Sequence, residues 1–342
     1  MTVVRFGDWS VRTRPRAVAV GLVCLAVALG VAVLAIGGGD YPMSPGRVLE
    51  TLAGGGSAAD AFIVRELRLP RVVTGLVVGA ALGLSGALFQ SVVRNPLGSP
   101  DVLGFTHGAS AGALLVIVVG GGGGLAVAGG AVTGAILTGA VIYALAWRHG
   151  THAYRLVLVG IGMWAILTGV NGYLLTKAEL FDAARAVLWL TGSLNGRSWN
   201  DVVPLLVVMA LLVPVVFLGY GRALRMLEMG DDAAQGLGVP AERARFALLG
   251  AAVLLVAFAA AAAGPVSFVA LTAPQLARRL TRAPGPNLLP ALLLGAALLT
   301  TADLAALRLF GDSRLPVGVV TGMLGGGYLV WLLATERKAG RI

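Results

Sequence analysis

The chain has 342 residues, of which 57% are hydrophobic and 12% are charged, and its formal net charge is +10. Because a soluble domain carries about a quarter of its residues as charged side chains, this composition excludes a soluble domain and indicates a polytopic membrane protein. The single cysteine, Cys24, excludes an intrachain disulfide and a thiolate metal cluster.

Apolar runs long enough to cross a bilayer recur along the whole chain. An apolar helix of about 20 residues spans the hydrocarbon core. The first run lacks an obvious cleavage site, so we interpret it as a membrane span and not as a signal peptide. We predict an all-α fold and one integral-membrane domain over residues 1–342, with about ten transmembrane helices near 17–36, 72–92, 102–119, 125–147, 156–175, 202–219, 246–263, 266–280, 288–307 and 317–334.

The positive charge follows the predicted topology. With the N-terminus inside, the cytoplasmic segments hold 17 of the 26 Lys and Arg residues, as the positive-inside rule predicts. We therefore expect both termini in the cytoplasm, and we attribute the basic balance to topology and not to nucleic-acid binding.

One cluster on the outer side opposes this trend. Arg65, Arg68 and Arg71 lie within seven residues before the second predicted span. Such a cluster favours an acidic partner or ligand, with lipid headgroups as the alternative.

The cytoplasmic segment 220–245 is the most charged part of the chain. Asp231 and Asp232 favour the N-terminus of a short helix, where carboxylates cap the chain and complement the dipole. Gly236 and Gly238 would end that helix. We expect a helix of one to two turns, a shape that fits a groove on a partner.

The sequence contains no phosphate-binding loop for ATP. Such a loop requires Gly-Lys-Ser/Thr, whereas the only lysines, Lys177 and Lys338, follow Thr176 and Arg337. ATP-driven transport would therefore need an ATPase on another subunit.

Two polar residues inside the predicted spans are candidates for function. Asp303 is either a functional carboxylate, such as a proton site, or a structural acceptor for helix ends or for Arg308. His107, near the start of the third predicted span, is either a packing residue or part of a transport path.

Two other patterns favour structural interpretations. Gly83-Leu84-Ser85-Gly86 has the form of a serine-protease nucleophile motif, but the one candidate base, His107, lies near a span's start while Ser85 is mid-span, so small-residue packing is favoured. His149 and His152 have metal-like spacing, but arginines flank them and no carboxylate lies beside them. We predict no metal site and no cofactor.

Long motifs carry a resemblance to a known family. Residues 68–104 contain R-L-P-R, then G-A-A-L-G-L-S-G-A-L-F-Q, then R-N-P-L-G-S-P, and G-P-V-S-F-V-A-L and L-P-V-G-V-V-T follow at 264–271 and 315–321. These motifs resemble the FecCD/BtuC-type permease subunits of type II ABC importers, which take up iron–siderophores, haem and cobalamin. The segments 192–196, 227–232 and 325–329 resemble most the permeases of the ferric-enterobactin type. Gln275 and His107 stand where the family usually has other residues.

The resemblance implies a transport subunit of a bacterial cytoplasmic membrane, without enzymatic activity of its own. The implied partners are a second permease subunit (a different one or a second copy), two ATP-binding subunits that use the ATP, and an external substrate-binding protein. The implied cargo is an iron–siderophore of catecholate type, with haem or cobalamin as alternatives and a proton-coupled secondary transporter as the less favoured class.

The resemblance also assigns roles to individual residues. It places Arg65, Arg68, Arg71 and Arg308 where the binding protein docks, and it places the ATPase-coupling helix at Glu228, Asp231, Asp232, Gly236, Leu237 and Gly238. Gln90, at the end of the second motif, joins His107 and Asp303 as a candidate for the translocation path or for a structural role.

Overall fold

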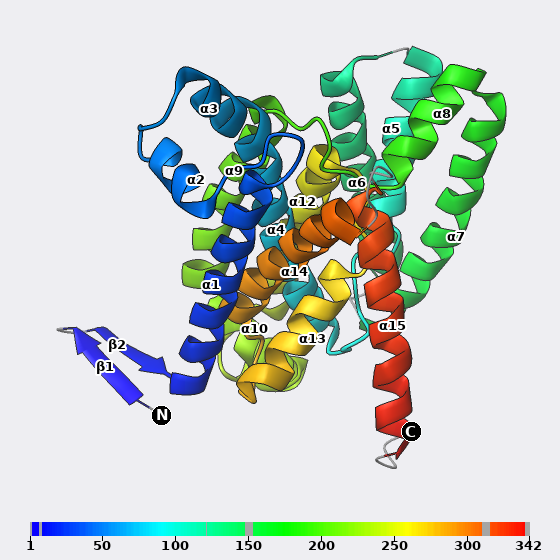
Figure 1. Ribbon diagram of the computed structural model, residues 1–342. Helices are drawn as coiled ribbons and strands as arrows, with labels where there is room; N and C mark the ends of the chain where they lie inside the picture. The colour runs from blue at the N-terminus through cyan, green and yellow to red at the C-terminus, as the bar shows by residue number, and fades with distance from the viewer. Residues whose placement is uncertain (1, 7–8, 121, 148–152, 310–314, 339–342) are drawn as a thin grey trace.

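The computed structural model describes residues 2–6, 9–120, 122–147, 153–309 and 315–338, so His149 and His152 lie outside the described residues. Its body is a bundle of helices (Figure 1), which confirms the predicted all-α class. A short antiparallel hairpin, β1 (Thr2–Phe6) and β2 (Trp9–Thr13), precedes the bundle. The sequence analysis does not predict this hairpin.

A helix lies in each of the ten ranges where the sequence predicts a span. Among the described residues, seven helices are long and apolar enough to cross a membrane. The helices in the ten ranges are α1 (Pro15–Gly37), α4 (Leu69–Val93), α5 (Phe105–Gly120), α6 (Gly124–Ala146), α7 (Ala153–Lys177), α9 (Trp199–Pro214, continued by the π-helical η2, Val215–Tyr220), α12 (Ala241–Ala263), α13 (Val269–Thr281), α14 (Leu288–Leu309) and α15 (Val317–Lys338).

Helix α13 is shorter than its predicted range suggests. It has 13 residues, which rise about 20 Å, whereas the hydrocarbon core is about 30 Å thick. The preceding residues 264–268 are not part of it: Gly264 and Phe268 both have positive φ, 74° and 67°. The chain therefore enters this part of the bundle as irregular backbone, which is tolerated at membrane depth only where protein or a cavity surrounds it.

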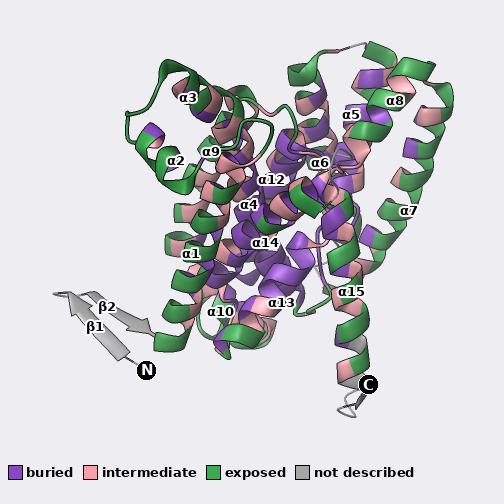
Figure 2. Cartoon of the chain, viewed as in Figure 1, coloured by how far each residue is buried: buried purple, intermediate pink, exposed green. Residues whose placement is uncertain are grey.

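Helix α4 is the centre of the bundle. Of the most apolar window in the segment Ala58–Val93, 83% is buried, and α4 packs against α12, α13 and α14, which form the purple interior of Figure 2. A Cβ added to Gly83 would collide with the carbonyl oxygen of Ala291 on α14. The small residues of the second motif therefore allow direct contact between helix backbones.

Helices α7 and α15 lie at the edge of the bundle. Only 17% of the apolar window of α7 is buried. Figure 2 shows α7 mostly exposed and α15 with a mixture of exposed, intermediate and buried residues. Large apolar side chains such as Ile166 on α7 and Val330 on α15 are 62% and 71% exposed. These faces need lipid or another protein subunit to cover them.

Short helices occupy the two ends of the bundle. The end that carries the predicted outer segments holds α2 (Pro45–Leu52), α3 (Ala58–Phe62), the π-helical η1 (Ile63–Arg68) and α8 (Leu180–Leu190). The opposite end holds α10 (Gly221–Glu228) and α11 (Asp231–Gly236). Figure 1 shows α2, α3 and α8 at the top of the view and α10 at the bottom.

The chain between α4 and α5 is an irregular segment, residues 94–104. Arg94 ends α4 in the left-handed conformation, with φ of 55°, and the Asn95 side chain accepts a hydrogen bond from the amide of Leu97 at 2.9 Å. The Gln275 side chain on α13 donates to the carbonyl of Pro96 at 2.8 Å. This segment therefore packs back against the bundle.

Candidate functional site

Two of the predicted docking arginines bind the C-terminal turn of α1. Arg68 donates to the carbonyls of Ile36 at 2.7 Å and Tyr41 at 2.8 Å, and Arg308 donates to that of Leu34 at 3.5 Å. The last carbonyls of a helix lack partners within the helix and lie at the negative end of its dipole. These arginines therefore cap α1.

A third arginine plays the same part for a smaller helix. Arg65 donates to the carbonyl of Thr51, in the last turn of α2, at 3.0 Å, and its own carbonyl accepts from the indole of Trp199 at 3.3 Å. Arg65 is exposed, and a guanidinium has five N–H donors. Capping leaves donors for a partner, so the predicted docking role is compatible with these bonds and stays a prediction.

Arg71 differs from its neighbours because it is paired inside the bundle. Its Nε and Nη2 atoms donate to Oδ2 and Oδ1 of Asp303 at 3.1 and 2.8 Å, and the two side chains are 20% and 5% exposed. Asp303 is therefore the acceptor of a two-bond ion pair between α4 and α14. Of the two interpretations of Asp303, the contacts support the structural one, with Arg71 and not Arg308 as its partner.

The predicted coupling helix exists as α11, but its carboxylates do not cap it. Asp231 and Asp232 lie in the first turn, Gly230 is the N-cap residue, and no side chain makes a cap hydrogen bond. Instead, Oδ1 of Asp231 lies 2.7 Å from Arg245 of α12 and 3.7 Å from Arg94 at the end of α4. Asp231 thus connects α11 to two spanning helices.

The other predicted coupling residues form an exposed surface around α11. Leu237 is 59% exposed. Met229, which follows the predicted residue Glu228 but is not itself predicted, is 62% exposed. Asp232, Gly236 and Gly238 are also exposed. The remaining one, Glu228, is half-buried and interacts electrostatically with Arg278 of α13. An exposed apolar pair beside carboxylates suits a protein partner.

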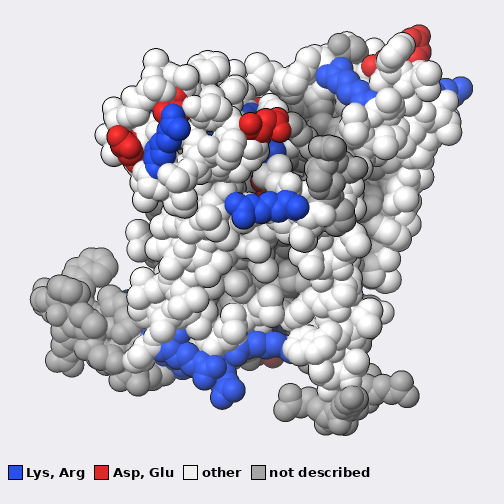
Figure 3. Space-filling model, viewed as in Figure 1, with Lys and Arg blue, Asp and Glu red and all other residues white. Residues whose placement is uncertain are grey.

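Charge on the surface separates into two zones. Figure 3 shows charged side chains over the upper half of the face in view, one basic side chain among them reaching toward its middle, and others along the lower end, with an uncharged belt between the two groups. Such a belt is what a hydrocarbon core requires of the surface that it touches.

Two polar side chains of α4 hold it to its neighbours. Gln90 donates through Nε2 to the carbonyl of Leu271 on α13 at 3.0 Å, and Ser85 donates to the carbonyl of Ala252 on α12 at 2.9 Å. Ser85 is fully buried, so these bonds support the packing interpretation of the Gly-x-Ser-Gly motif. The bond of Gln90 links α4 to α13, its Oε1 has no partner among the described residues, and its path role stays a prediction.

His107 lies beside a cavity. The cavity has a volume of about 580 Å³, and its lining includes Ser99 and Asp101 of segment 94–104, Trp164 of α7 and Phe268 before α13. The His107 ring meets the Trp164 ring edge to face, with 5.8 Å between centroids. His107 thus lines a cavity, its path role stays a prediction, and Asp303 is not among the residues that line this cavity.

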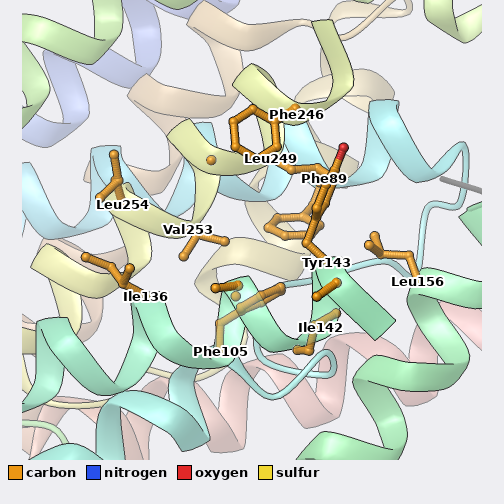
Figure 4. Close-up of a pocket in the computed structure, with 14 residues that line it drawn as sticks. Phe89, Phe105, Ile136, Ile142, Tyr143, Leu156, Phe246, Leu249, Val253 and Leu254 are labelled. Carbon is orange, nitrogen blue, oxygen red and sulfur yellow. The ribbon is translucent and has the colours of Figure 1, made fainter. Parts of the chain in front are cut away.

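A second cavity, of about 490 Å³, is apolar (Figure 4). Aliphatic and aromatic side chains from α4, α5, α6, α7 and α12 form it, among them Phe89, Phe105 and Val253. In the part of the chain that the structure describes, the only polar side-chain group in its lining is the Tyr143 hydroxyl. A single hydroxyl makes this cavity better suited to an apolar occupant than to a polar ligand.

Sequence reasoning misses Arg94, Arg245, Asp101 and Trp164 as site residues. Arg94 and Asp101 both belong to the motif R-N-P-L-G-S-P-D, and that motif was the available signal. Nothing in the sequence marks Arg245 or Trp164, because their positions depend on how the helices pack.

Comparisons with known proteins agree with the motifs. The pattern of the FecCD transport family matches residues 24–335. The chain is 45% identical to the ferric enterobactin transport system permease protein FepG of Escherichia coli (strain K12), over 93% of this chain and 97% of that protein. It is 39% identical to the achromobactin transport system permease protein CbrC of Dickeya dadantii (strain 3937), over 93% and 92%.

The fold also has a solved counterpart. A structure described as an inward-facing conformation of a metal-chelate type ABC transporter superposes with a TM-score of 0.81 at 25% identity, covering 93% of this chain and 99% of that one. The family resemblance predicted from the motifs is confirmed. The chain belongs to the FecCD transport family.

Proposed function

We propose that this chain is the permease subunit of an ABC transporter that imports a ferric siderophore of catecholate type across the cytoplasmic membrane, with both termini in the cytoplasm. The observation that carries the cargo is the 45% identity to a ferric enterobactin permease over 93% of the chain. Two ends with different chemistry, one carrying α11 and one carrying the capping arginines, support the transport role.

The surface around α11 supports attachment to an ATP-binding subunit. Leu237 and Met229 are exposed at the end that carries the cytoplasmic segments, and Asp231 ties α11 to Arg94 and Arg245. A movement of α11 would therefore reach α4 and α12. ATP binding changes the state of the path only if the ATPase holds α11 differently in its two states.

The opposite end supports docking of an acidic binding protein. Arg65 and Arg308 are exposed, and Arg68 is half-buried. Their bonds to helix ends hold these guanidinium groups in place. Binding of a partner carboxylate would therefore cost little side-chain conformational entropy.

The exposed apolar faces of α7 and α15 support a second permease subunit across a central path. We expect a different permease, as in a heterodimer, and a second copy of this chain is the other outcome. A proton-coupled mechanism through Asp303 is less well supported, because both oxygens of that carboxylate already bind Arg71.

Growth on single iron sources tests the cargo. A strain that lacks this gene should fail to grow on a ferric catecholate siderophore as its only iron source, and it should grow on haem as the parent does. Loss of growth on haem alone, or loss of cobalamin uptake, would assign the other cargo.

A further inference from the structure

The cavity beside His107 is built by four parts of the chain that are distant in the sequence. Segment 94–104 contributes Ser99 and Asp101, α5 contributes His107, α7 contributes Trp164, and the chain before α13 contributes Ser267 and Phe268. Its volume of about 580 Å³ lies in the usual range for small-molecule sites. Two of these parts, segment 94–104 and residues 264–268, are irregular backbone between spans.

Two buried polar atoms of the lining have no hydrogen-bond partner among the described residues. They are Oδ2 of Asp101 and Nδ1 of His107. The other carboxylate oxygen of Asp101 accepts from the Thr106 hydroxyl at 2.7 Å, and the backbone amide of Phe268 also interacts with this carboxyl, so the side chain is fixed. Because an unpaired buried polar group is costly, a ligand that pairs with these two atoms would gain stability from them.

The rest of the lining is aromatic or apolar except for the hydroxyls of Ser99 and Ser267. The ring of Trp164 contacts His107 edge to face. Phe268 also lines the cavity and packs against α15, where a Cβ on Gly325 would collide with its side chain. Phe268 adopts a φ of 67°, which is an outlier for a bulky residue. Strained residues of this kind gather at ligand sites, where the surrounding structure holds them.

The apolar cavity lined by Phe89 and Val253 provides a contrast. Among the described residues its lining has no unpaired buried polar atom. Lipid chains would fill this cavity, or its side chains would repack to close it. Of these two cavities, the one beside His107 combines aromatic surfaces with fixed polar atoms that have no partner among the described residues.

We propose that this cavity is a cargo-contact site on the translocation path, which takes one aromatic chelating unit of a catecholate siderophore. The proposal rests on the function proposed above. The aryl ring would stack on Trp164 or Phe268, and a donor on the unit, such as the amide N–H that links a catechol to its scaffold, would bind Oδ2 of Asp101. His107 would contact the polar edge of the same unit.

The mixture of contacts suits a path and not a storage site. Conduction requires binding that is favourable enough for entry and weak enough for release. Stacking and one or two hydrogen bonds attract the ring. The carboxylate of Asp101 would at the same time repel an anionic chelate, which keeps its residence short.

Iron uptake by the complete transporter tests the site. The probe is a radiolabelled ferric catecholate, and the variants are Trp164→Leu, Trp164→Phe and Asp101→Asn, which keeps the oxygen that binds Thr106. Trp147→Leu, on a half-exposed ring at the end of α6, is the matched control. We expect Trp164→Leu and Asp101→Asn to lower the uptake rate by about threefold to tenfold. Trp164→Phe should restore most of the rate, and the control should match the unmodified transporter.

The outcomes separate this proposal from the proposed function. Uptake by the unmodified transporter together with unchanged uptake in Trp164→Leu and Asp101→Asn would overturn the cargo-contact site alone. Equal losses in Trp164→Phe and Trp164→Leu would also overturn it, since they would indicate packing and not stacking. Absence of ferric catecholate uptake by the unmodified transporter would overturn the proposed function itself.

Discussion

Arg71 on α4 and Asp303 on α14 form an ion pair of two hydrogen bonds, 3.1 and 2.8 Å long, although 232 residues separate them in the sequence. The pair joins the central helix of the bundle to its closest neighbour. Its carboxylate is 5% exposed, so each charge depends on the other for compensation.

Removing one member of this pair should destabilise the protein. Breaking a buried pair leaves an uncompensated charge and costs about 3–5 kcal/mol, and the partial exposure of Arg71 places the expected loss for Asp303→Asn at the lower end. The thermal unfolding midpoint of the purified protein measures this. The double variant Arg71→Met/Asp303→Leu should recover most of the loss and retain uptake, whereas a proton site at Asp303 would abolish uptake in both variants.

Charge reversal at Arg68 should weaken docking of the binding protein. We expect Arg68→Glu to slow association by about tenfold at low salt, because charges at a docking surface act chiefly on the association rate. Biolayer interferometry at two ionic strengths measures the association rate. Arg68→Gln removes the charge without reversing it and should have a smaller effect, and equal association rates for all three proteins would leave Arg68 only its role as a cap of α1.

Neutralising Asp231 should uncouple ATP hydrolysis from uptake. Asp231 is the residue through which α11 contacts Arg94 and the buried Arg245. In Asp231→Asn we expect uptake to fall by more than the ATPase rate of the assembled transporter. Arg243→Gln, an exposed change on the same helix as Arg245, is the control. A parallel fall in both rates would indicate lost assembly and not lost coupling.

Replacing glycine by alanine should change the stability of the protein differently at two positions. Gly83→Ala places a methyl group against the carbonyl of Ala291, whereas nothing lies within 4 Å of a Cβ at Gly250 of α12. Alanine favours a helix over glycine by about 1 kcal/mol, so Gly250→Ala should be neutral or stabilising. Gly83→Ala should lower the unfolding midpoint, and a stable Gly83→Ala protein would contradict the close contact of α4 and α14.

Asp60 should keep the segment that contains α2 and α3 folded in mild acid. The Arg47 guanidinium, with help from Ser57, holds the pKa of Asp60 at about 2, below its ordinary value of 3.8, and the pair joins α2 to α3. Because the folded pKa is the lower one, this contribution is present above pH 3.8 and is lost as the pH falls toward 2. Hydrogen exchange in residues 45–62 should stay slow at pH 5. In Asp60→Asn it should be faster already at pH 7.

Local patterns in the sequence predict much of this fold. The apolar runs predict the helices in the ten span ranges, from α1 to α15, because the length of an apolar run is a property of one segment alone. The pair Asp231 and Asp232 marks α11 for the same reason, since helix-end preferences act within one turn. Even so, the bond that Asp231 makes is not the predicted cap.

Contacts between distant segments could not be predicted in this way. The sequence offers Arg308 as a partner for Asp303 because it is near in the chain, but the packing of α4 on α14 brings Arg71 closer. Arg68 binding the end of α1 depends on the arrangement of three helices. Asp101 becomes a cavity residue only because segment 94–104 packs back into the bundle.

Uptake in a defined system tests whether this chain is the permease of an ATP-driven importer of ferric catecholates. The chain, its partner permease, the ATP-binding subunits and the binding protein would be reconstituted in proteoliposomes, and entry of radiolabelled ferric catecholate would be measured with and without ATP. We predict uptake that requires ATP, the ATP-binding subunits and the binding protein together, and that is insensitive to a pH gradient. Uptake driven by a pH gradient without ATP would contradict an ABC importer and indicate a proton-coupled transporter.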